Sequence, residues 1–229
     1  MNPIIRIEDL WKSYDEEGRG GTTALRGLDL EVSAGETVAI CGKSGSGKTT
    51  LFNLIAGLDR PTRGTIFLEG RDIHNMGELE RTRFRRARLG FVFQFFNLIP
   101  TLTALENILL PLEMLHKGSG LAHEALRAVG LSGKERRFPH ELSGGEQQRI
   151  AIARALVKDP VLILADEPTG NLDNETGNQV LALLENLSRR AGTTLLLATH
   201  SERSSRIADR VLTMSDGRIS DESAGENRS

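Results

Sequence analysis

The hydrophobic and polar positions of the chain change period several times, and each change predicts a different element. Residues 4–10 and 25–32 alternate apolar and polar side chains, which is typical of edge-type antiparallel strands. Residues 14–23 between them are polar and glycine-rich and predict an exposed loop. A continuous apolar run at 37–41 then predicts a buried strand, and 49–58 continue at helical period.

The middle of the chain has a different pattern. From about Arg81 to Arg154 the apolar residues mostly recur at helical spacing, which predicts a helical insert. After it, two β-rich runs at 161–168 and 194–200 flank the helical pattern of 177–192, an order typical of a βαβ unit in a parallel sheet.

The end of the chain predicts a hairpin at 210–220, followed by a polar tail at 221–229 that we expect to be disordered. Together these patterns predict an α/β fold in a single domain spanning residues 1–229. Its catalytic core comprises about 1–90 and 155–220, with an antiparallel β subdomain, and an inserted helical subdomain occupies about 91–154.

Composition narrows the class of partner. The 229 residues carry a formal net charge of −2, so no global basic field favours nucleic acid, and we expect none as a partner. Cys41 is the single cysteine and forms no internal disulfide. No apolar run approaches the roughly 18 residues that span a bilayer. We therefore expect a cytoplasmic protein that reaches any membrane through another chain.

The segment between the apolar run at 37–41 and the helical pattern at 49–58 carries the first chemical motif. Gly42, Gly47, Lys48 and Thr49 match the pattern Gly-x-x-x-x-Gly-Lys-Ser/Thr between a predicted strand and a predicted helix. Glycines let consecutive N–H groups face inward, where they bind phosphates. Lys48 is placed to reach the β- and γ-phosphates, and the Thr49 hydroxyl to coordinate Mg²⁺. The predicted phosphate-binding residues are Gly42, Lys43, Ser44, Gly45, Ser46, Gly47, Lys48, Thr49 and Thr50.

Two acidic residues and a histidine follow the β-rich runs. Asp166 ends the first run, where it can hold Mg²⁺ directly or through water, and Glu167 can act as a general base toward the attacking water. His200 ends the second run and can contact the γ-phosphate or the water. Each has a simpler alternative: the acids cap the next segment or face solvent, and the histidine satisfies a backbone carbonyl.

A second anion-binding helix start is predicted at Ser143, Gly144 and Gly145, which precede a long run of helical period. One nucleotide hardly needs two such surfaces, so we expect two chains to pair head to tail, each covering the other's nucleotide. The alternative is an ordinary capping box formed by Ser143 and Glu146, and both interpretations can hold together.

Taken together, these motifs resemble those of the ATP-binding cassette (ABC) ATPases, from about Ile5 to Ile219. The segment LSGGEQQR is the most specific of them. The stretches FNLIPTLTALENILLPL and DEPTGNLD look most like the subfamily of lipoprotein-releasing and macrolide-export ATPases, which also includes cell-division and antimicrobial-peptide-resistance members.

The resemblance assigns roles to further residues. It implies that Tyr14 stacks on adenine, that Gln94 contacts Mg²⁺ at the junction with the helical subdomain, and that Glu167 is the catalytic base and His200 the switch histidine. It further implies ATP and Mg²⁺ as cofactors. The predicted metal ligands are Thr49, Gln94 and Asp166. The signature residues that meet the partner chain's ATP are Ser143, Gly144, Gly145 and Glu146, and the loop at the dimer interface contains Gly170, Asn171, Leu172 and Asp173.

The function that follows is an ATPase subunit that powers a separate membrane permease, in export, in extraction of lipoprotein or lipid, or in mechanical transmission. A signalling complex of the cell-division type, a soluble ABC protein of repair or translation, and a nucleotide-binding scaffold are the alternatives. Phe95, Phe96 and Leu98 are candidates for a groove that takes a partner's helix, although a core role for at least one phenylalanine is equally compatible with the pattern. The basic stretch ELERTRFRRARLG is better explained as a solvated helix face than as a lipid contact.

Overall fold

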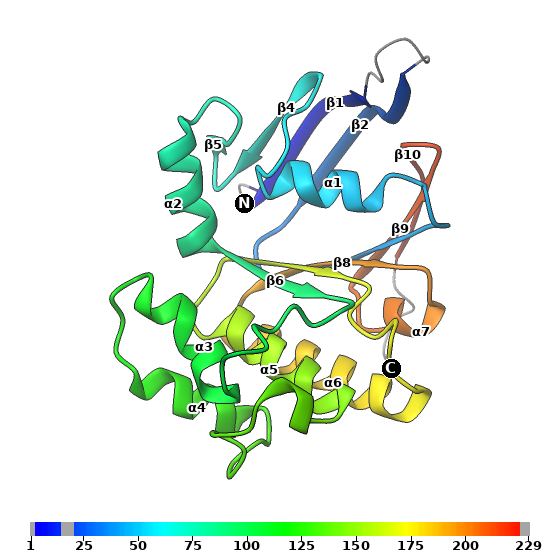
Figure 1. Cartoon of the computed structure of the whole chain (residues 1–229). Coiled ribbons are helices and arrows are strands. Elements are labelled where there is room, and N and C mark those ends of the chain that lie inside the picture. The colour runs from blue at the N-terminus through cyan, green and yellow to red at the C-terminus, as the bar shows by residue number, and fades with distance from the viewer. Residues whose placement is uncertain (1–2, 15–20, 225–229) are drawn as a thin grey trace. The chain divides into compact units, whose positions relative to one another are not determined.

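The computed structural model describes residues 3–14 and 21–224, and its contacts divide the chain into two compact units (Figure 1). The first unit comprises residues 1–85 and 196–229, and the second comprises 86–195. Each unit is described by itself. Because the second unit extends to Leu195, it contains more than the helical subdomain predicted at about 91–154.

The first unit contains an antiparallel sheet. Its strands are β1 (Ile5–Tyr14), β2 (Thr22–Val32), β4 (Arg63–Leu68) and β5 (Arg71–Asp72), in the order β2-β1-β4-β5. In β1, Ile5 and Ile7 are buried and alternate with the exposed Arg6 and Glu8. A register shift between Ile7 and Leu10 offsets this alternation, and Leu10 is buried as well. The expectation that β1 is an edge strand is wrong, since β1 pairs with β2 on one side and β4 on the other.

A second group of strands in this unit carries the glycine-rich loop. Strand β3 (Thr37–Cys41) pairs in parallel with β9 (Arg210–Ser215), and β9 pairs antiparallel with β10 (Arg218–Ala224). The predicted hairpin is therefore confirmed. The helices are α1 (Lys48–Ile55), α7 (Glu202–Ser205) and α2 (Glu78–Arg88), which extends three residues into the second unit. Strand β8 (Thr194–Thr199) also crosses the boundary between the units.

Two predicted irregular segments differ from the structure or fall outside it. The disorder expected for 221–229 is wrong for residues 221–224, because their backbone pairs with β9, Asp221 opposite Thr213 and Ala224 opposite Arg210. Residues 225–229 lie outside the described residues, as do 15–20 of the predicted loop.

The second unit contains a strand that the helical spacing of residues 81–154 did not predict. Strand β6 (Leu89–Phe93) pairs in parallel with β7 (Leu162–Asp166), although residues 89–93 fall within the stretch assigned to helical spacing. Its five residues form a short apolar run, and such a run has no periodicity that separates a buried strand from a helix. A Cβ on Gly90 would lie 2.8 Å from the backbone oxygen of Ala155, so β6 packs tightly against the neighbouring helix.

The helices of the second unit, green and yellow in Figure 1, pack around an apolar core. They are α3 (Ala104–Glu113), α4 (Gly120–Ala128), the 3-10 turn η1 (Pro139–Glu141), α5 (Gly144–Leu156) and α6 (Asn174–Ala191). The core joins α3, α4 and α5 through fully buried side chains such as Ile108, Leu112, Ala122 and Ile150. In the part of the chain that is described, no helix has both the length and the apolar character needed to cross a bilayer.

One buried polar residue organises the loop that leads into α3. Asn107 has no exposed surface, and its Nδ2 donates to the carbonyl oxygens of Ile99, Leu102 and Thr103 at 3.0–3.2 Å. Its Oδ1 accepts from the Ile99 N–H at 2.8 Å. Since backbone polar groups must find partners, this side chain supplies four of the hydrogen bonds that residues 99–103 do not obtain from regular secondary structure.

We expect Asn107→Ala to destabilise the protein by about 2–4 kcal/mol, because it leaves several buried backbone groups without partners. Urea unfolding of the variant and the wild type measures the difference. Asn75→Ala is the matched control, because Asn75 is exposed. Equal stabilities of the two variants would contradict the role assigned to Asn107.

Candidate nucleotide-binding and catalytic site

The glycine-rich loop lies in the first unit, between the end of β3 at Cys41 and the start of α1 at Lys48. Its glycines meet specific geometric demands. Gly47 has φ 109°, a conformation that L side chains rarely adopt. A Cβ on Gly42 would lie 2.4 Å from Met214 O and 2.7 Å from Ser46 Oγ. The loop can therefore curl this closely only with glycine at these positions.

The curled loop is held from two sides. The N–H of Gly42 donates to Thr199 O at 3.3 Å, and Ser46 O accepts from the N–H of Gly217 at 3.0 Å, at the turn between β9 and β10. Lys48 is only 6% exposed, and its Nζ donates to Gly42 O at 2.7 Å and to Lys43 O at 3.0 Å. A buried amine in a curled loop at a helix start fits the phosphates of a nucleotide, whose charge complements it.

The aromatic residue assigned to adenine stacking has well-defined partners. Tyr14 is 42% exposed, and its hydroxyl donates to Asp59 Oδ2 at 2.8 Å. Burial and this hydrogen bond raise the pKa of the Tyr14 phenol. The Nζ of Lys12 lies 4.6 Å from the centroid of the Tyr14 ring and also donates to Asp59 Oδ1 at 2.7 Å. A base that stacks on Tyr14 must therefore use the face opposite Lys12.

Asp59 is the shared partner of this group, and none of the sequence motifs points to it. Burial alone would raise the pKa of its carboxyl, but hydrogen bonds from Lys12 and Tyr14 leave that pKa below its ordinary value. Trp11 packs within the first sheet, where its ring lies 3.3 Å from the position of a Cβ on Gly27. Two further predicted residues of this unit are Thr49, in the first turn of α1, and His200, which directly follows β8 and is exposed.

The acidic pair lies in the second unit, as its sequence position indicates. Asp166 is the last residue of β7, and Glu167 follows with φ 47°. A non-glycine residue with this φ is under backbone strain, which concentrates at functional sites. Both acidic residues are half-buried, and the carbonyl of Glu167 accepts from the Gly170 N–H at 3.0 Å. The strand end therefore places a half-buried carboxyl group on a rigid turn.

Gln94 directly follows β6 and is joined to the predicted interface loop. Its Nε2 donates to Asn171 Oδ1 at 3.1 Å, and Asn171 Nδ2 donates back to Gln94 O at the same distance. A Cβ on Gly170 would lie 2.8 Å from Gln94 Nε2, so a larger residue there would displace the glutamine side chain. The Gln94 turn and the interface loop, which the motifs predict separately, are thus joined by hydrogen bonds.

The signature residues form the N-terminus of α5. Ser143 Oγ accepts from the Glu146 N–H at 3.3 Å, and Glu146 Oε2 accepts from the Ser143 N–H at 2.9 Å. The predicted capping box is confirmed. The hydrogen bond from the Ser143 backbone is the main cause that lowers the pKa of Glu146, and Lys134 adds an ion pair at 3.3 Å. Since Ser143 is exposed, the helix start remains accessible.

The interface loop packs against this helix start. A Cβ on Gly145 would lie 2.4 Å from Thr176 Cγ2, and one on Gly144 would lie 3.2 Å from Leu172 Cδ2. Asp173 caps α6 by accepting from the N–H groups of Glu175 and Thr176 at 3.0 Å. These contacts bring Gln94, the signature and the interface loop together within one unit.

The predicted groove residues behave differently from one another. Phe95 is 72% exposed, but Phe96 is only partly exposed and Leu98 packs against the helical core. None of the three lines the nearby cavity of about 290 Å³. Its lining includes Phe91, Phe93, Leu110, Met114, Arg154 and Lys158. Of the three, only Phe95 is largely exposed, and a groove lined by these residues stays a prediction.

Comparisons with known proteins bear on what this arrangement does. A family model described as "ABC transporter" matches residues 25–170, which include the glycine-rich loop, the signature and the acidic pair. The chain belongs to the ABC transporter family. Membership makes it an ABC ATPase that uses ATP and Mg²⁺, and the predicted fold is confirmed.

Curated relatives of the ABC family cover nearly the whole chain. An uncharacterized ABC transporter ATP-binding protein of Mycobacterium tuberculosis is 49% identical over 95% of this chain and 89% of its own length. The lipoprotein-releasing system ATP-binding protein LolD of Geobacter metallireducens is 44% identical, covering 96% and 99% respectively. The macrolide export ATP-binding/permease protein MacB of Rhodopirellula baltica is 45% identical over 96% of this chain but only 33% of its own length. The predicted closeness to this subfamily is confirmed.

Solved structures of ABC cassettes agree with this membership. The dimeric MJ0796, a bacterial ABC transporter cassette, matches with a TM-score of 0.89 at 39% identity over 98% of this chain and all of that one. A dimeric post-hydrolysis state of MJ0796 bound to ADP and Pi matches with a TM-score of 0.88 at 38% identity, with the same coverage.

The close approach at Gly42 yields a test of the glycine-rich loop. We expect Gly42→Ala to weaken nucleotide binding at least about tenfold, because the added methyl group collides with Met214 O and must open the loop. Fluorescence titration with a labelled ATP analogue measures the affinity. Gly77→Ala is the matched control, because a Cβ there would have no atom within 4 Å. Unchanged affinity of Gly42→Ala would contradict the geometric demand.

Proposed function

We propose that this chain is the ATP-hydrolysing subunit of a membrane export or extraction system and that it lies at the cytoplasmic face of the membrane through a separate permease. The observation that carries the proposal is the accessible capping-box start of α5 in a chain that already has a phosphate-binding loop. A second chain explains both surfaces, since each signature would meet the other chain's nucleotide. The dimeric cassettes and the names of LolD and MacB support this proposal.

Each residue then has a definite task. The loop amides and Lys48 bind the phosphates, and Tyr14 stacks on the base. Thr49, Gln94 and Asp166 offer the oxygen ligands that Mg²⁺ prefers, and the ion, when bound, neutralises charge on the phosphate oxygens. Glu167 accepts the proton of the attacking water, and His200 contacts the γ-phosphate. Since Ser143 meets the γ-phosphate only while ATP is intact, hydrolysis releases the dimer.

The proposed base is tested by Glu167→Gln. This variant keeps the shape of the side chain but cannot accept a proton, so we expect turnover to fall at least about 100-fold while ATP binding persists. ATP-dependent dimers should accumulate. Phosphate release measures the turnover, and light scattering measures the dimers. Glu175→Gln, an exposed change of the same type in α6, is the control and should leave turnover unaltered. Unchanged turnover of Glu167→Gln would falsify the assignment.

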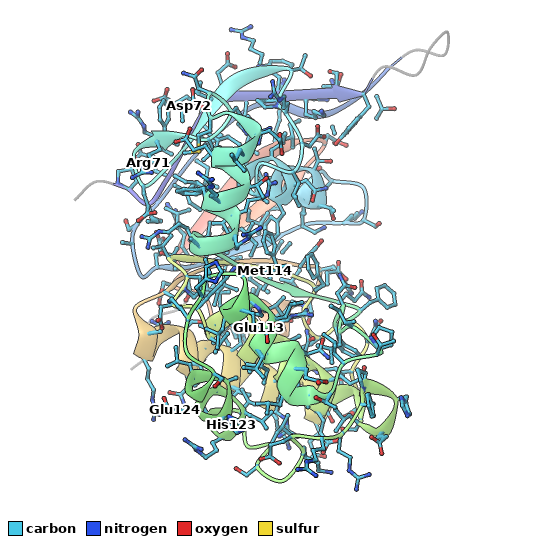
Figure 2. All side chains as sticks on the ribbon, turned by 60° about the vertical axis from the view of Figure 1, so that its left-hand side comes forward. Arg71, Asp72, Glu113, Met114, His123 and Glu124 are labelled. Carbon is cyan, nitrogen blue, oxygen red and sulfur yellow. The ribbon has the colours of Figure 1, made fainter. Side chains whose placement is uncertain are left out.

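The cavity beside β6 is the proposed docking site for the permease. Phe91 and Phe93, whose stacked ring centroids lie 5.8 Å apart, line it. Met114, which directly follows α3 and is labelled in Figure 2, lines it as well. Arg154 and Lys158 also line it, and the lining contains no acidic residue among those described. The cavity therefore fits a helical segment of the membrane partner that presents an apolar side chain and a carboxylate.

Lys158 makes this docking site sensitive to pH. Burial, with smaller contributions from the charges of Arg86 and Lys117, lowers the pKa of the Lys158 amine to about 8. The amine is therefore charged at pH 7 and loses its proton as the pH rises through 8. The attraction to a carboxylate falls in the same range.

Affinity capture from gently solubilised membranes, with ATP, Mg²⁺ and the Glu167→Gln chain as bait, tests the docking site. We expect an integral membrane protein to be captured, and Lys158→Glu to reduce its recovery at least about tenfold through charge repulsion. Capture should also weaken from pH 7 to pH 9. Arg127→Glu, an exposed charge reversal on α4, is the matched control. Equal recovery with both reversals would place the permease elsewhere.

A further inference from the structure

Helix α5 carries a buried polar residue, Gln148, for which the sequence motifs predict no role. Gln148 lies on the apolar stripe of the helix, four residues from both Gly144 and Ile152, and has no exposed surface. A glutamine at such a position must find partners for its amide, and its choice of partners is informative.

The side-chain amide of Gln148 bridges two functional segments. Its Nε2 donates to Phe93 O at 3.1 Å and also to Pro168 O. Phe93 directly precedes Gln94, and Pro168 directly follows Glu167. One NH₂ group therefore fixes the backbone at the exit of β6 and the backbone after β7, next to the two residues that are proposed to act on metal and water.

The orientation of the amide is set by these two acceptors. Both neighbours are carbonyl oxygens, so the amide must present its nitrogen, and its Oε1 is buried without a hydrogen-bond partner among the described residues. An unpaired buried acceptor is unfavourable. The Gln148 amide carries this cost together with the two hydrogen bonds that its nitrogen donates. A purely packing role would be filled better by an apolar side chain of the same size.

The same helix holds the other end of the Gln94 turn. Arg154 Nη1 donates to Asn97 O at 2.6 Å, and its Nη2 donates to Phe96 O at 2.8 Å. Phe96 and Asn97 have φ 58° and 49°, so the backbone between these contacts is strained. Helix α5 thus holds the backbone on both sides of Gln94: Gln148 binds the carbonyl of Phe93 before it, and Arg154 binds the carbonyls of Phe96 and Asn97 after it.

We propose that Gln148 is a positioning residue for ATP hydrolysis: it links the signature helix to Gln94 and Glu167 of the same chain, and Arg154 completes the grip on the Gln94 turn. A shift of the N-terminus of α5 then moves the metal-contacting amide and the catalytic base together. The proposal rests on the ATPase activity, and it adds that the signature helix aligns the site of its own chain as well as meeting the nucleotide of the other.

The test compares Gln148→Met with Gln147→Met in ATP turnover. Methionine keeps the length of glutamine but donates no hydrogen bond. Gln147 is the neighbouring residue, and its Nε2 also donates to one backbone carbonyl, that of Leu142 at 3.0 Å. We expect Gln148→Met to lower kcat about 10- to 100-fold with KM for ATP within about threefold of wild type, and Gln147→Met to change neither by more than about threefold.

A double-variant cycle separates positioning from general damage. If Gln148 acts through Gln94, then Gln148→Met should cost clearly less in a Gln94→Ala background than in the wild type, because the aligned group is already gone. An equal loss in both backgrounds, or a kcat of Gln148→Met within about threefold of wild type, would overturn the proposal.

A second variant keeps the test valid if Gln148→Met does not fold, which its thermal unfolding profile reveals. Arg154 is only partly buried, so Arg154→Met perturbs the core less. It should lower kcat about 3- to 10-fold, with KM for ATP unchanged, because it releases only one side of the turn. Wild-type kcat in Arg154→Met would overturn the two-sided grip. If the wild-type protein did not turn over ATP at all, that result would instead contradict the proposed function.

Discussion

The second unit depends on how the backbone carbonyls after β6 are satisfied. The chain leaves the strand at Phe93 and turns through two residues of positive φ, so its carbonyls have no regular ladder to join. Side chains take over: Gln148 and Arg154 from α5, and Asn171 from the loop after β7. Because backbone polar groups must be paired, these donors stabilise a turn of this shape. The position of Gln94 therefore depends on its own turn, on α5 and on the loop after β7.

In the first unit the corresponding constraint is steric. The loop before α1 lies so close to the β9–β10 hairpin that a methyl group on Gly42 would overlap a backbone oxygen. Gly217 at the hairpin turn closes the arrangement by donating to Ser46 O. Strand pairing between β3 and β9 fixes the register of both, so the phosphate-binding loop takes its shape from residues about 170 positions away in sequence. The loop motif alone does not encode that support.

Much of this could be predicted from the sequence because the motifs are local. The glycine-rich loop, the acidic pair at a strand end and the capping box at Ser143 each specify a short conformation through their own side chains. Strand β6 was missed because its five apolar residues carry no period, and β1 was misplaced as an edge because alternation does not reveal how many neighbours a strand has. The partners of Gln148 and Asp59 lie 20 to 55 residues away, and single-sequence patterns do not report such contacts.

The surroundings of Tyr14 bear on which nucleotides the chain distinguishes. The hydroxyl of Tyr14 is committed to Asp59, and the amine of Lys12 to Asp59 and to Arg60 O, so these polar atoms hold one another. A ring that binds a base by its face contacts the π surface that every base possesses, and it does not probe the groups on the base edge. If Tyr14 stacks on the base as proposed, selection between adenine and guanine is therefore weak at this position. In the proposed dimer, discrimination would rest on the number of phosphates, which the loop of one chain and the signature of the other would contact.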